Sequence, residues 1–280
     1  MIYSFSMINF VKIMPIWDWN FFNETMLLAQ TNCVELVPSM LLGLEWDDIS
    51  SISDSKYHRT LDKFLNTYTV KSIQSLTYGL DINLAVNFRE SGQMARRINA
   101  LRYLSKITGC SNFILGSPSQ KKRVESLSSS YNYRENFIQN CRWFAEQLGE
   151  NIMLNLEHNT ILQGAEYCNT LSEIVEVVKS LMSSGVSNVG INLDTKCLID
   201  EFGSDVNISS LINSLEIESL IRSVQVDYDC LRRDSPAKIN DLLALKKIST
   251  QHGVTISLEE FGLQSQQISE FIKTWRQVLE

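Results

Sequence analysis

Short apolar runs alternate along the chain with longer segments that mix apolar and polar positions. We expect these runs to be strands, because each is short, apolar and bounded by polar or helix-forming residues. They recur at nearly regular intervals without a break in composition, and each interval has room for a helix. The eight predicted strands are Ile2–Ile8, Cys33–Val37, Ser72–Leu76, Asn112–Leu115, Ile152–Leu156, Val189–Leu193, Ser223–Val226 and Thr255–Leu258.

The intervals between these runs carry apolar residues at the spacing of one helical face. The clearest case is Glu90–Thr108, in which Met94 and Ile98 fall on the same side. Thr170 is followed three residues later by Glu173, which has the form of a capping box at a helix start. The predicted helices are Asn20–Thr31, Glu90–Thr108, Tyr133–Leu148, Thr170–Met182, Ser235–Thr250 and Gln266–Leu279.

Eight strands that alternate with helices indicate parallel pairing, because a crossover helix joins parallel neighbours. An open, doubly wound sheet is the competing architecture, but no GxGxxG or GxxxxGK[ST] motif follows any of the runs. No linker rich in Pro, Gly or Ser divides the chain. We therefore predict an α/β fold, a single-domain (β/α)₈ TIM barrel that spans residues 1–280.

Three of the predicted strands are followed at once by a carboxylate. Glu157, Asp194 and Glu259 come directly after apolar runs, and in a barrel the C-terminal ends of the strands form one mouth. Carboxylates that converge there repel one another unless a cation neutralises them. The pattern favours a hard divalent metal ion with oxygen ligands. The alternative is that an acidic residue at a strand end only caps a helix, which Asp194 before Thr195 can do. The segment after Glu157 does not open into a helix.

Composition and charge narrow the class of partner. The chain has 280 residues and a net charge of −7, so it has no overall basic field for nucleic acid or anionic lipid. Its six Cys are scattered without a CxxC pair, which is typical of reduced thiols in a cytosolic protein. We find neither a basic signal-peptide leader nor an apolar run long enough to cross a membrane. The sequence predicts a cytoplasmic protein without a nucleic-acid or membrane partner.

Several motifs, in their order and spacing, resemble those of a known family. They are "VELVPS", "ILGSPSQKK", "LNLEHN", "GINLDTKC" and "SLEE", and they fall at the second, fourth, fifth, sixth and eighth predicted strands. In these motifs the chain resembles the xylose isomerase-like TIM barrel superfamily, the sugar phosphate isomerase/epimerase family. The resemblance spans almost the whole chain.

The resemblance implies one divalent ion, Mn²⁺ or Mg²⁺, bound by four residues after the fifth to eighth strands. Glu157, Asp194 and Glu259 match three of the four positions. The fourth, expected to hold His, corresponds to Gln225, a neutral and weaker donor for transition metals. The family often has a second His three residues after the Asp, and Cys197 stands there instead.

The resemblance further implies proton transfer next to a sugar carbonyl through an enediolate, with Glu157 and Glu259 as the catalytic carboxylates. Glu260 is the alternative to Glu259, because strand alternation lets only one of the two face inward. Arg232, after the seventh strand, is at a position where the family often grips substrate oxygens, although a solvated loop residue is an equal alternative.

Two further groups are candidates for substrate contact. Trp17 or Trp19, after the first strand, is a candidate wall for a sugar pocket, with a core role as the alternative. The charges of Lys121–Arg123 suit either a phosphate site or a solvated surface. His158 should point away from Glu157 by strand alternation, which favours a structural role.

The leading hypothesis is a metal-dependent sugar or sugar-phosphate isomerase/epimerase with a small-molecule sugar partner. The resemblance also leaves room for a homo-oligomer. An endonuclease that acts at abasic DNA sites with several zinc ions is a second hypothesis, but three His in all and a charge of −7 argue against it. A third is a barrel that binds a sugar-like ligand without turnover or performs related lyase or dehydratase chemistry. Gln225 and Cys197 keep this third hypothesis open.

Overall fold

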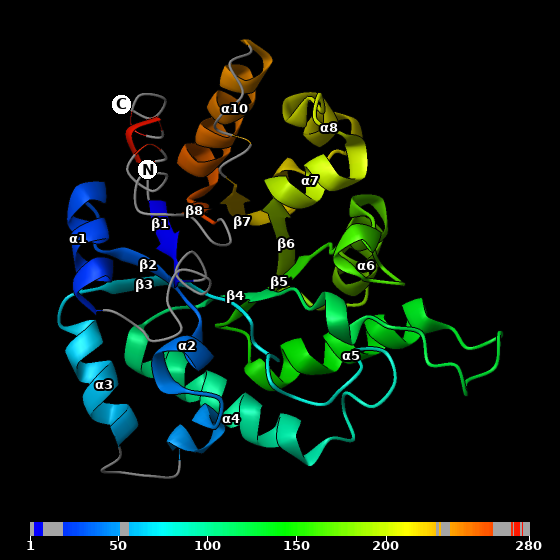
Figure 1. Cartoon of the computed structure of the whole chain (residues 1–280). Coiled ribbons are helices and arrows are strands. Elements are labelled where there is room, and N and C mark those ends of the chain that lie inside the picture. The colour runs from blue at the N-terminus through cyan, green and yellow to red at the C-terminus, as the bar shows by residue number, and fades with distance from the viewer. Residues whose placement is uncertain are drawn as a thin grey trace.

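Eight parallel strands close into a barrel in the part of the chain that the computed structural model describes, and helices surround them (Figure 1). The described residues are 3–7, 19–50, 56–227, 230, 236–259, 270, 272–274 and 276. Each strand pairs with its neighbour in the sequence, and the last pairs with the first, so the sheet has no free edge. The predicted (β/α)₈ TIM barrel is confirmed.

The strands follow the predicted apolar runs closely, with one exception. The third strand was expected at Ser72–Leu76 and lies at Thr69–Ile73. It ends early because Ser75 adopts a left-handed φ of 56°, which breaks the extended backbone. The strands are β1 (Tyr3–Ser6), β2 (Cys33–Leu36), β3 (Thr69–Ile73), β4 (Asn112–Leu115), β5 (Met153–Glu157), β6 (Val189–Asp194), β7 (Ile221–Val226) and β8 (Thr255–Leu258).

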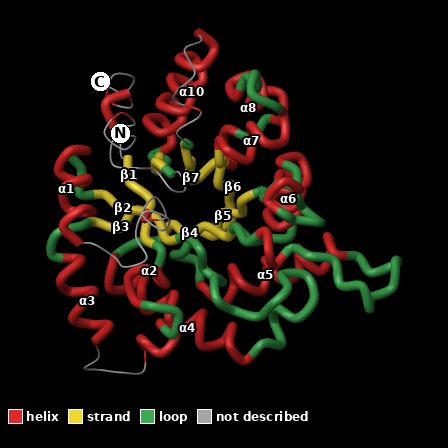
Figure 2. Tube along the Cα trace, viewed as in Figure 1, coloured by secondary structure: helices red, strands yellow, loops and turns green. Residues whose placement is uncertain are grey.

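Helices form the outer layer around the strands (Figure 2). The α-helices are α1 (Trp19–Ala29), α2 (Pro38–Leu42), α3 (Lys56–Leu65), α4 (Gly92–Thr108), α5 (Tyr133–Leu148), α6 (Leu171–Ser183), α7 (Thr195–Phe202), α8 (Ile208–Leu215) and α10 (Pro236–His252). Short 3₁₀ turns are η2 (Trp46–Ser50), η3 (Pro118–Gln120), η4 (Ile161–Gln163) and η5 (Glu218–Leu220). Thr170 and Glu173 form the predicted capping box at α6. The helix predicted at Gln266–Leu279 lies largely outside the described residues.

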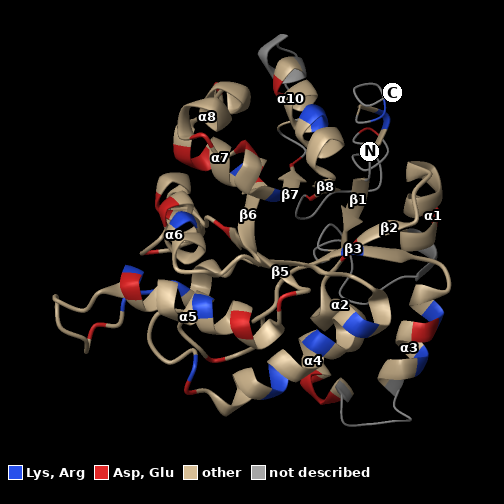
Figure 3. Cartoon of the chain, turned by 180° about the vertical axis from the view of Figure 1, so that it is seen from behind, with Lys and Arg blue, Asp and Glu red and all other residues tan. Residues whose placement is uncertain are grey.

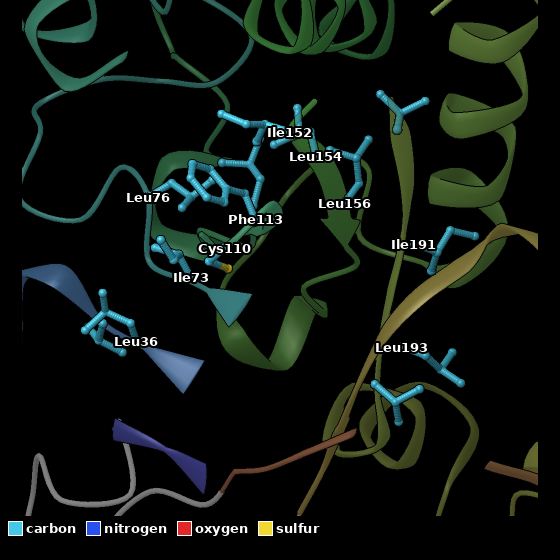
Figure 4. Close-up of a cluster of buried hydrophobic side chains, with 14 of the residues drawn as sticks. Leu36, Ile73, Leu76, Cys110, Phe113, Ile152, Leu154, Leu156, Ile191 and Leu193 are labelled. Atoms are coloured by element: carbon cyan, nitrogen blue, oxygen red, sulfur yellow. The ribbon is translucent and has the colours of Figure 1, made fainter. Parts of the chain in front are cut away.

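The apolar core lies between the barrel wall and the helices. On β5, Leu154 and Leu156 are fully buried, and on β6 the same is true of Ile191 and Leu193 (Figure 4). Helix α6 packs on both strands with a face that includes Ile174, also fully buried. Burial of the outward strand faces under the helices explains the apolar residues that mark the runs from which the strands were predicted.

The inner side of the barrel is polar. Side chains alternate between the faces of a strand, and hydrogen bonds between non-neighbouring strands identify the inward set. Gln225 on β7 donates to Glu35 on β2 at 2.9 Å, and Gln74, which follows β3, donates to Ser6 on β1 at 2.7 Å. These bonds place polar groups inside the barrel toward the C-terminal ends of its strands.

Acidic and basic residues are distributed over the outer helices. In the rear view, blue and red segments both occur on α3 and on α5, whereas the charged residues of α4 are all basic (Figure 3). Among the described helices, none combines the length and the apolar character needed to cross a membrane.

Candidate active site

The ends of three strands bring the predicted carboxylates to one cavity of about 560 Å³. Glu157, Asp194 and Glu259 all line it, and they follow from β5, β6 and β8. Much of the remaining lining consists of hydroxyl and amide side chains, including Gln74, Ser75, Tyr78, Ser117, Ser119, Gln120, Asn159 and Gln163. The arrangement suits a ligand with many hydroxyl groups, because each side chain can donate or accept a hydrogen bond.

Glu157 is held in one orientation by its neighbours. Asn159 Nδ2 donates to Oε1 at 2.7 Å, and Asn192 Nδ2 donates to Oε2 at 3.2 Å. On the other side lies Gly116, where an added Cβ would come within 2.6 Å of the carboxylate carbon. Glycine therefore makes the space that this carboxylate occupies, and the bare backbone at Gly116 forms part of its cradle.

Asp194 serves as a helix cap and lines the cavity at the same time. Its Oδ1 accepts a hydrogen bond from the backbone N–H of Lys196 at 2.8 Å, so it is the N-cap of α7. Its Oδ2 lies 3.0 Å from Cys197 Sγ, which donates to it. The cap that the sequence left as an alternative is present, and it leaves the second oxygen turned toward Cys197.

Glu259 is engaged by two amides. Gln74 Nε2 and Gln225 Nε2 each donate to its Oε2 at 2.6 Å. Both amides also donate to Oε1 of Glu35, at 2.7 and 2.9 Å, and Glu35 is only 1% exposed. Ser72 completes the set by donating to the other oxygen of Glu35. Two amides thus tie a buried carboxylate to one that faces the cavity.

Sequence reasoning missed Glu35 and Gln74. Glu35 carried one available signal, since it is an acid inside the apolar run of β2. An acid buried within a strand needs hydrogen-bond partners, which here come from β3 and β7. Gln74 gave no signal, because its role depends on the way in which the early end of β3 directs its side chain.

Burial and mutual repulsion shift the carboxylates toward their neutral forms. Burial, followed by the charge of Asp194, raises the pKa of Glu157 to about 8. Burial raises the pKa of Asp194 to about 6, although hydrogen bonds to Cys197 and Lys196 oppose the shift. Burial and the charge of Glu35 hold the pKa of Glu259 well above its usual range. A bound cation would reverse these shifts by favouring the ionised forms.

Lys121 directly follows Gln120, which lines the cavity, yet its ammonium group does not form an ion pair with a described carboxylate. Its side chain is fully buried, and Nζ donates to the main-chain oxygen of Glu157 at 3.0 Å. Burial lowers its pKa. The expectation of a solvated surface run therefore fails at Lys121, because the loop after β4 folds it inward. Its neighbour Lys122 is exposed and pairs with Glu166 at 3.3 Å.

The donor atoms can hold a divalent cation. Atoms of Glu157, Asp194 and Cys197 lie within 4.8 Å of one another. Gln225, predicted as a fourth ligand, has its amide nitrogen bound to Glu35 and Glu259, and its Oε1 accepts from Asn192. The cradle at Gly116 and the two carboxylates fit a cation, while the Gln225 amide is engaged elsewhere in the network.

Other predicted residues are placed as follows. His158 is fully buried, with Nε2 3.4 Å from a carboxylate oxygen of Glu201, and burial lowers its pKa to about 4. This placement agrees with a structural role. Trp17, Arg232 and Glu260 lie outside the described residues. Trp19 begins α1.

Comparison with known proteins gives similarity in structure. No protein-family model matches the chain, and no curated protein matches it in sequence. The probable 3-DHS dehydratase AsbF from Bacillus anthracis, involved in petrobactin synthesis, has a similar structure, with a TM-score of 0.66 at 14% identity over 100% of this chain and 98% of that chain. A D-psicose 3-epimerase structure determined in the presence of D-fructose gives 0.62 at 16% identity, over 98% and 90%. An L-ribulose 3-epimerase gives 0.61 at 14% identity, over 99% and 95%.

These identities show a shared fold, so the resemblance inferred from the motifs is confirmed at the level of the barrel.

Proposed function

We propose that the protein is a divalent-metal-dependent sugar isomerase or epimerase that works by proton transfer between carboxylates and a carbon next to a carbonyl. The observation that carries the proposal is the placement of Glu157 and Glu259, from β5 and β8, on one cavity lined by hydroxyl and amide groups. Similar structures include a D-psicose 3-epimerase and an L-ribulose 3-epimerase, which supports a sugar epimerase.

The metal would be held by Glu157, Asp194 and Glu259, with Mn²⁺ or Mg²⁺ as the ions that the sequence predicts. When bound, the ion supplies Lewis-acid polarisation of substrate oxygens. Gln225 would ligate through its Oε1, which accepts a hydrogen bond from Asn192, so it would have to give up that bond in order to act as a fourth ligand. Its role as a ligand stays a prediction.

Glu157 and Glu259 carry out the proton transfer. An ionised carboxylate takes the proton from the carbon next to the carbonyl, and the electron pair of the broken C–H bond moves into the enediolate. A protonated carboxylate on the other face returns a proton to that carbon, which inverts its configuration. The pKa of Glu157, raised to about 8, suits this work, because a group that titrates near neutral pH can both accept and return a proton. The amides of Gln74 and Gln225 hold Glu259 in position for it.

The lining favours an unphosphorylated sugar. None of the described residues that line the cavity is Lys or Arg, and the lining includes Asp81 besides the three carboxylates of the site. Away from the metal, a phosphate group would meet Asp81 without a Lys or Arg of the described lining to compensate its charge. The hydroxyl groups of Ser75, Tyr78 and Ser119 in the lining can pair with those of a free ketose.

A dehydratase is the second candidate. Its reaction also begins with removal of a proton next to a carbonyl, and a probable dehydratase is among the similar structures. Gln225 and Cys197, where the family has His, are the observations that favour it. The cytoplasmic location, the single domain over residues 1–280 and the homo-oligomer stay predictions from the sequence, as do the substrate contacts of Trp17 and Arg232.

Exchange of substrate hydrogen with solvent deuterium tests the proposal. The metal-loaded protein is incubated with a panel of free ketoses in D₂O, and NMR follows the signal of the hydrogen next to the carbonyl. We expect loss of this signal with epimer formation in the native protein and no loss in Glu157→Gln or Glu259→Gln. Glu166→Gln is the matched control, because Glu166 is exposed and its carboxylate is bonded to Lys122 and Arg123. An unsaturated product would favour the dehydratase, and absence of exchange with every ketose would contradict both enzymes.

A further inference from the structure

A thiol stands beside the two carboxylates at the end of β6. Cys197, in the first turn of α7, is fully buried, and its Sγ lies 3.0 Å from Oδ2 of Asp194. Its Sγ, one oxygen of Glu157 and one of Asp194 all lie within 4.8 Å of one another. Zn–S bonds are about 2.3 Å and Zn–O bonds about 2.0–2.2 Å, so these atoms can meet at one ion after small side-chain movements.

Gln163 fixes the thiol from the other side. Its Nε2 donates to Cys197 Sγ at 3.2 Å, while its Oε1 accepts from the backbone N–H of Thr160 in the capping box of η4. Gln163 also lines the cavity. The sulfur is therefore held next to the cavity wall by an amide and a carboxylate, unlike the thiols packed in the apolar core, such as Cys141.

Negative charge at this place is only partly offset, because burial and the charge of Asp194 outweigh the effect of Lys121 on the pKa of Glu157. Glu157 and Asp194 repel each other, and the ammonium group of Lys121 donates to the main-chain oxygen of Glu157. The carboxylate of Glu157 is also locked by Asn159, Asn192 and the glycine cradle at Gly116, so it cannot turn away. A cation between Glu157 and Asp194 resolves this repulsion.

We propose that Cys197 is a metal ligand and that Glu157, Asp194 and Cys197 form a mixed oxygen and sulfur site for a borderline or soft cation such as Zn²⁺, Co²⁺ or Cd²⁺. Sulfur ligands select such ions, whereas Mg²⁺ and Mn²⁺ prefer oxygen alone. On binding, the S–H proton passes to solvent, and the sulfur electron pair forms the bond to the metal. The inference rests on the proposed metal dependence and changes both the ligand set and the preferred ion.

Metal titration of the native protein tests this inference without a substrate. Metal-stripped protein is titrated with Cd²⁺ and with Co²⁺, while ultraviolet and visible absorption follow the charge-transfer band that appears only when sulfur binds the ion. Calorimetry with Zn²⁺, Mn²⁺ and Mg²⁺ gives the affinities. The variants are Cys197→Ser and, as controls, Cys33→Ser, which removes a partly exposed thiol, and Cys141→Ser, which removes a buried thiol from α5.

The expected result is a band that saturates at one ion per chain in the native protein and in both controls and is lost in Cys197→Ser. We also expect Zn²⁺ affinity to fall at least about tenfold in that variant, with a smaller change for Mg²⁺. Circular dichroism shows whether Cys197→Ser folds. If it does not, a band that saturates at one ion per chain in the native protein and in both controls supports the inference, and absence of that band contradicts it.

Two results would overturn the inference, and they separate it from the proposed function. Mn²⁺ binding that depends on Asp194, together with no charge-transfer band for any ion, would mean an oxygen-only site and would leave the isomerase proposal intact. Absence of binding for every ion tested would overturn the mixed site and the metal dependence together.

Discussion

Gly116 and Glu157 approach so closely that a Cβ on the glycine would lie 2.6 Å from the carboxylate carbon. Gly116 directly follows β4, and β4 pairs with β5, which ends at Glu157. A carboxylate at the end of a strand thus gains its position from a missing side chain on the neighbouring strand.

Gly116→Ala should displace the Glu157 carboxylate, because an added methyl group and that carboxylate cannot occupy the same space. We expect metal affinity to fall by about tenfold or more, the size of effect seen when groups that orient a ligand are changed. Calorimetric titration of metal-stripped protein checks this. Gly92→Ala is the matched control, since nothing lies within 4 Å of a Cβ there and the residue begins α4. Equal affinities in all three proteins would show that Glu157 tolerates displacement.

Glu35→Ala should destabilise the barrel, because it leaves the amides of Gln74 and Gln225 without one shared acceptor. Loss of a buried hydrogen-bonded partner costs about 1–3 kcal/mol per unsatisfied group. The free energy of unfolding, measured with urea, should fall by at least that amount. Ser72→Ala removes only one donor to Glu35 and should cost about 1 kcal/mol. A stability loss in Glu35→Ala no larger than that in Ser72→Ala would contradict a central role for Glu35.

The metal-free protein should lose stability as pH rises from about 5 to 8.5. The pKa of Glu157 is raised to about 8, so in this window the unfolded chain releases a proton that the folded protein keeps. The folded state binds more protons, and its free energy of unfolding therefore decreases as pH increases. Asp194, raised to about 6, adds to the lower part of the same window.

Urea unfolding at pH 5 and pH 8.5 measures this change. The decrease should be smaller in Glu157→Gln, which cannot ionise, and saturating Zn²⁺ should remove much of it in the native protein by binding the ionised carboxylates. A decrease of the same size in Glu157→Gln would assign the pH dependence to other groups.

A free ketose should bind more tightly than its phosphate ester. The described lining contains acidic residues without Lys or Arg, so a phosphate meets repulsion that is worth about 1 kcal/mol or more per nearby charge. We expect a difference of about tenfold, measured by calorimetry with matched ketose pairs. Asp81→Asn should narrow the difference, because it removes one negative charge from the lining. Tighter binding of the phosphate ester would indicate a cation contributed by residues such as Arg232.

The fold was predictable because its signals are local. Burial of the outward strand faces under the helices produces the apolar residues of the runs, and the spacing of runs and helices indicates the barrel. The same alternation of strands and helices predicted the carboxylates at the strand ends and the cap at Asp194 as an alternative. The features that could not be predicted from the sequence depend on contacts between distant segments. Gln74 meets Glu259 across the barrel, and the inward turn of Lys121 depends on the loop after β4.

Local patterns also failed where backbone conformation overrides them. Ser75, with its left-handed φ, ends β3 before the apolar run suggests, and that early end allows Gln74 to bridge two carboxylates. Helices α3, α7 and α8 were not predicted. Their lengths of 10, 8 and 8 residues leave fewer turns in which a helical period can be recognised than the 17 and 16 residues of α4 and α5.

Calorimetric titration of metal-stripped native protein and Asp194→Asn with Zn²⁺ and Mn²⁺ tests the central claim most directly. Asparagine keeps the N-cap of α7 through its side-chain oxygen and removes only the charge, so the fold is retained. Asn207→Ala, which removes the cap of α8, controls for helix stability alone. We predict one bound ion in the native protein and in Asn207→Ala, with affinity at least about tenfold weaker in Asp194→Asn. Unchanged affinity in Asp194→Asn, or no binding in the native protein, would contradict a metal site at the mouth of this barrel.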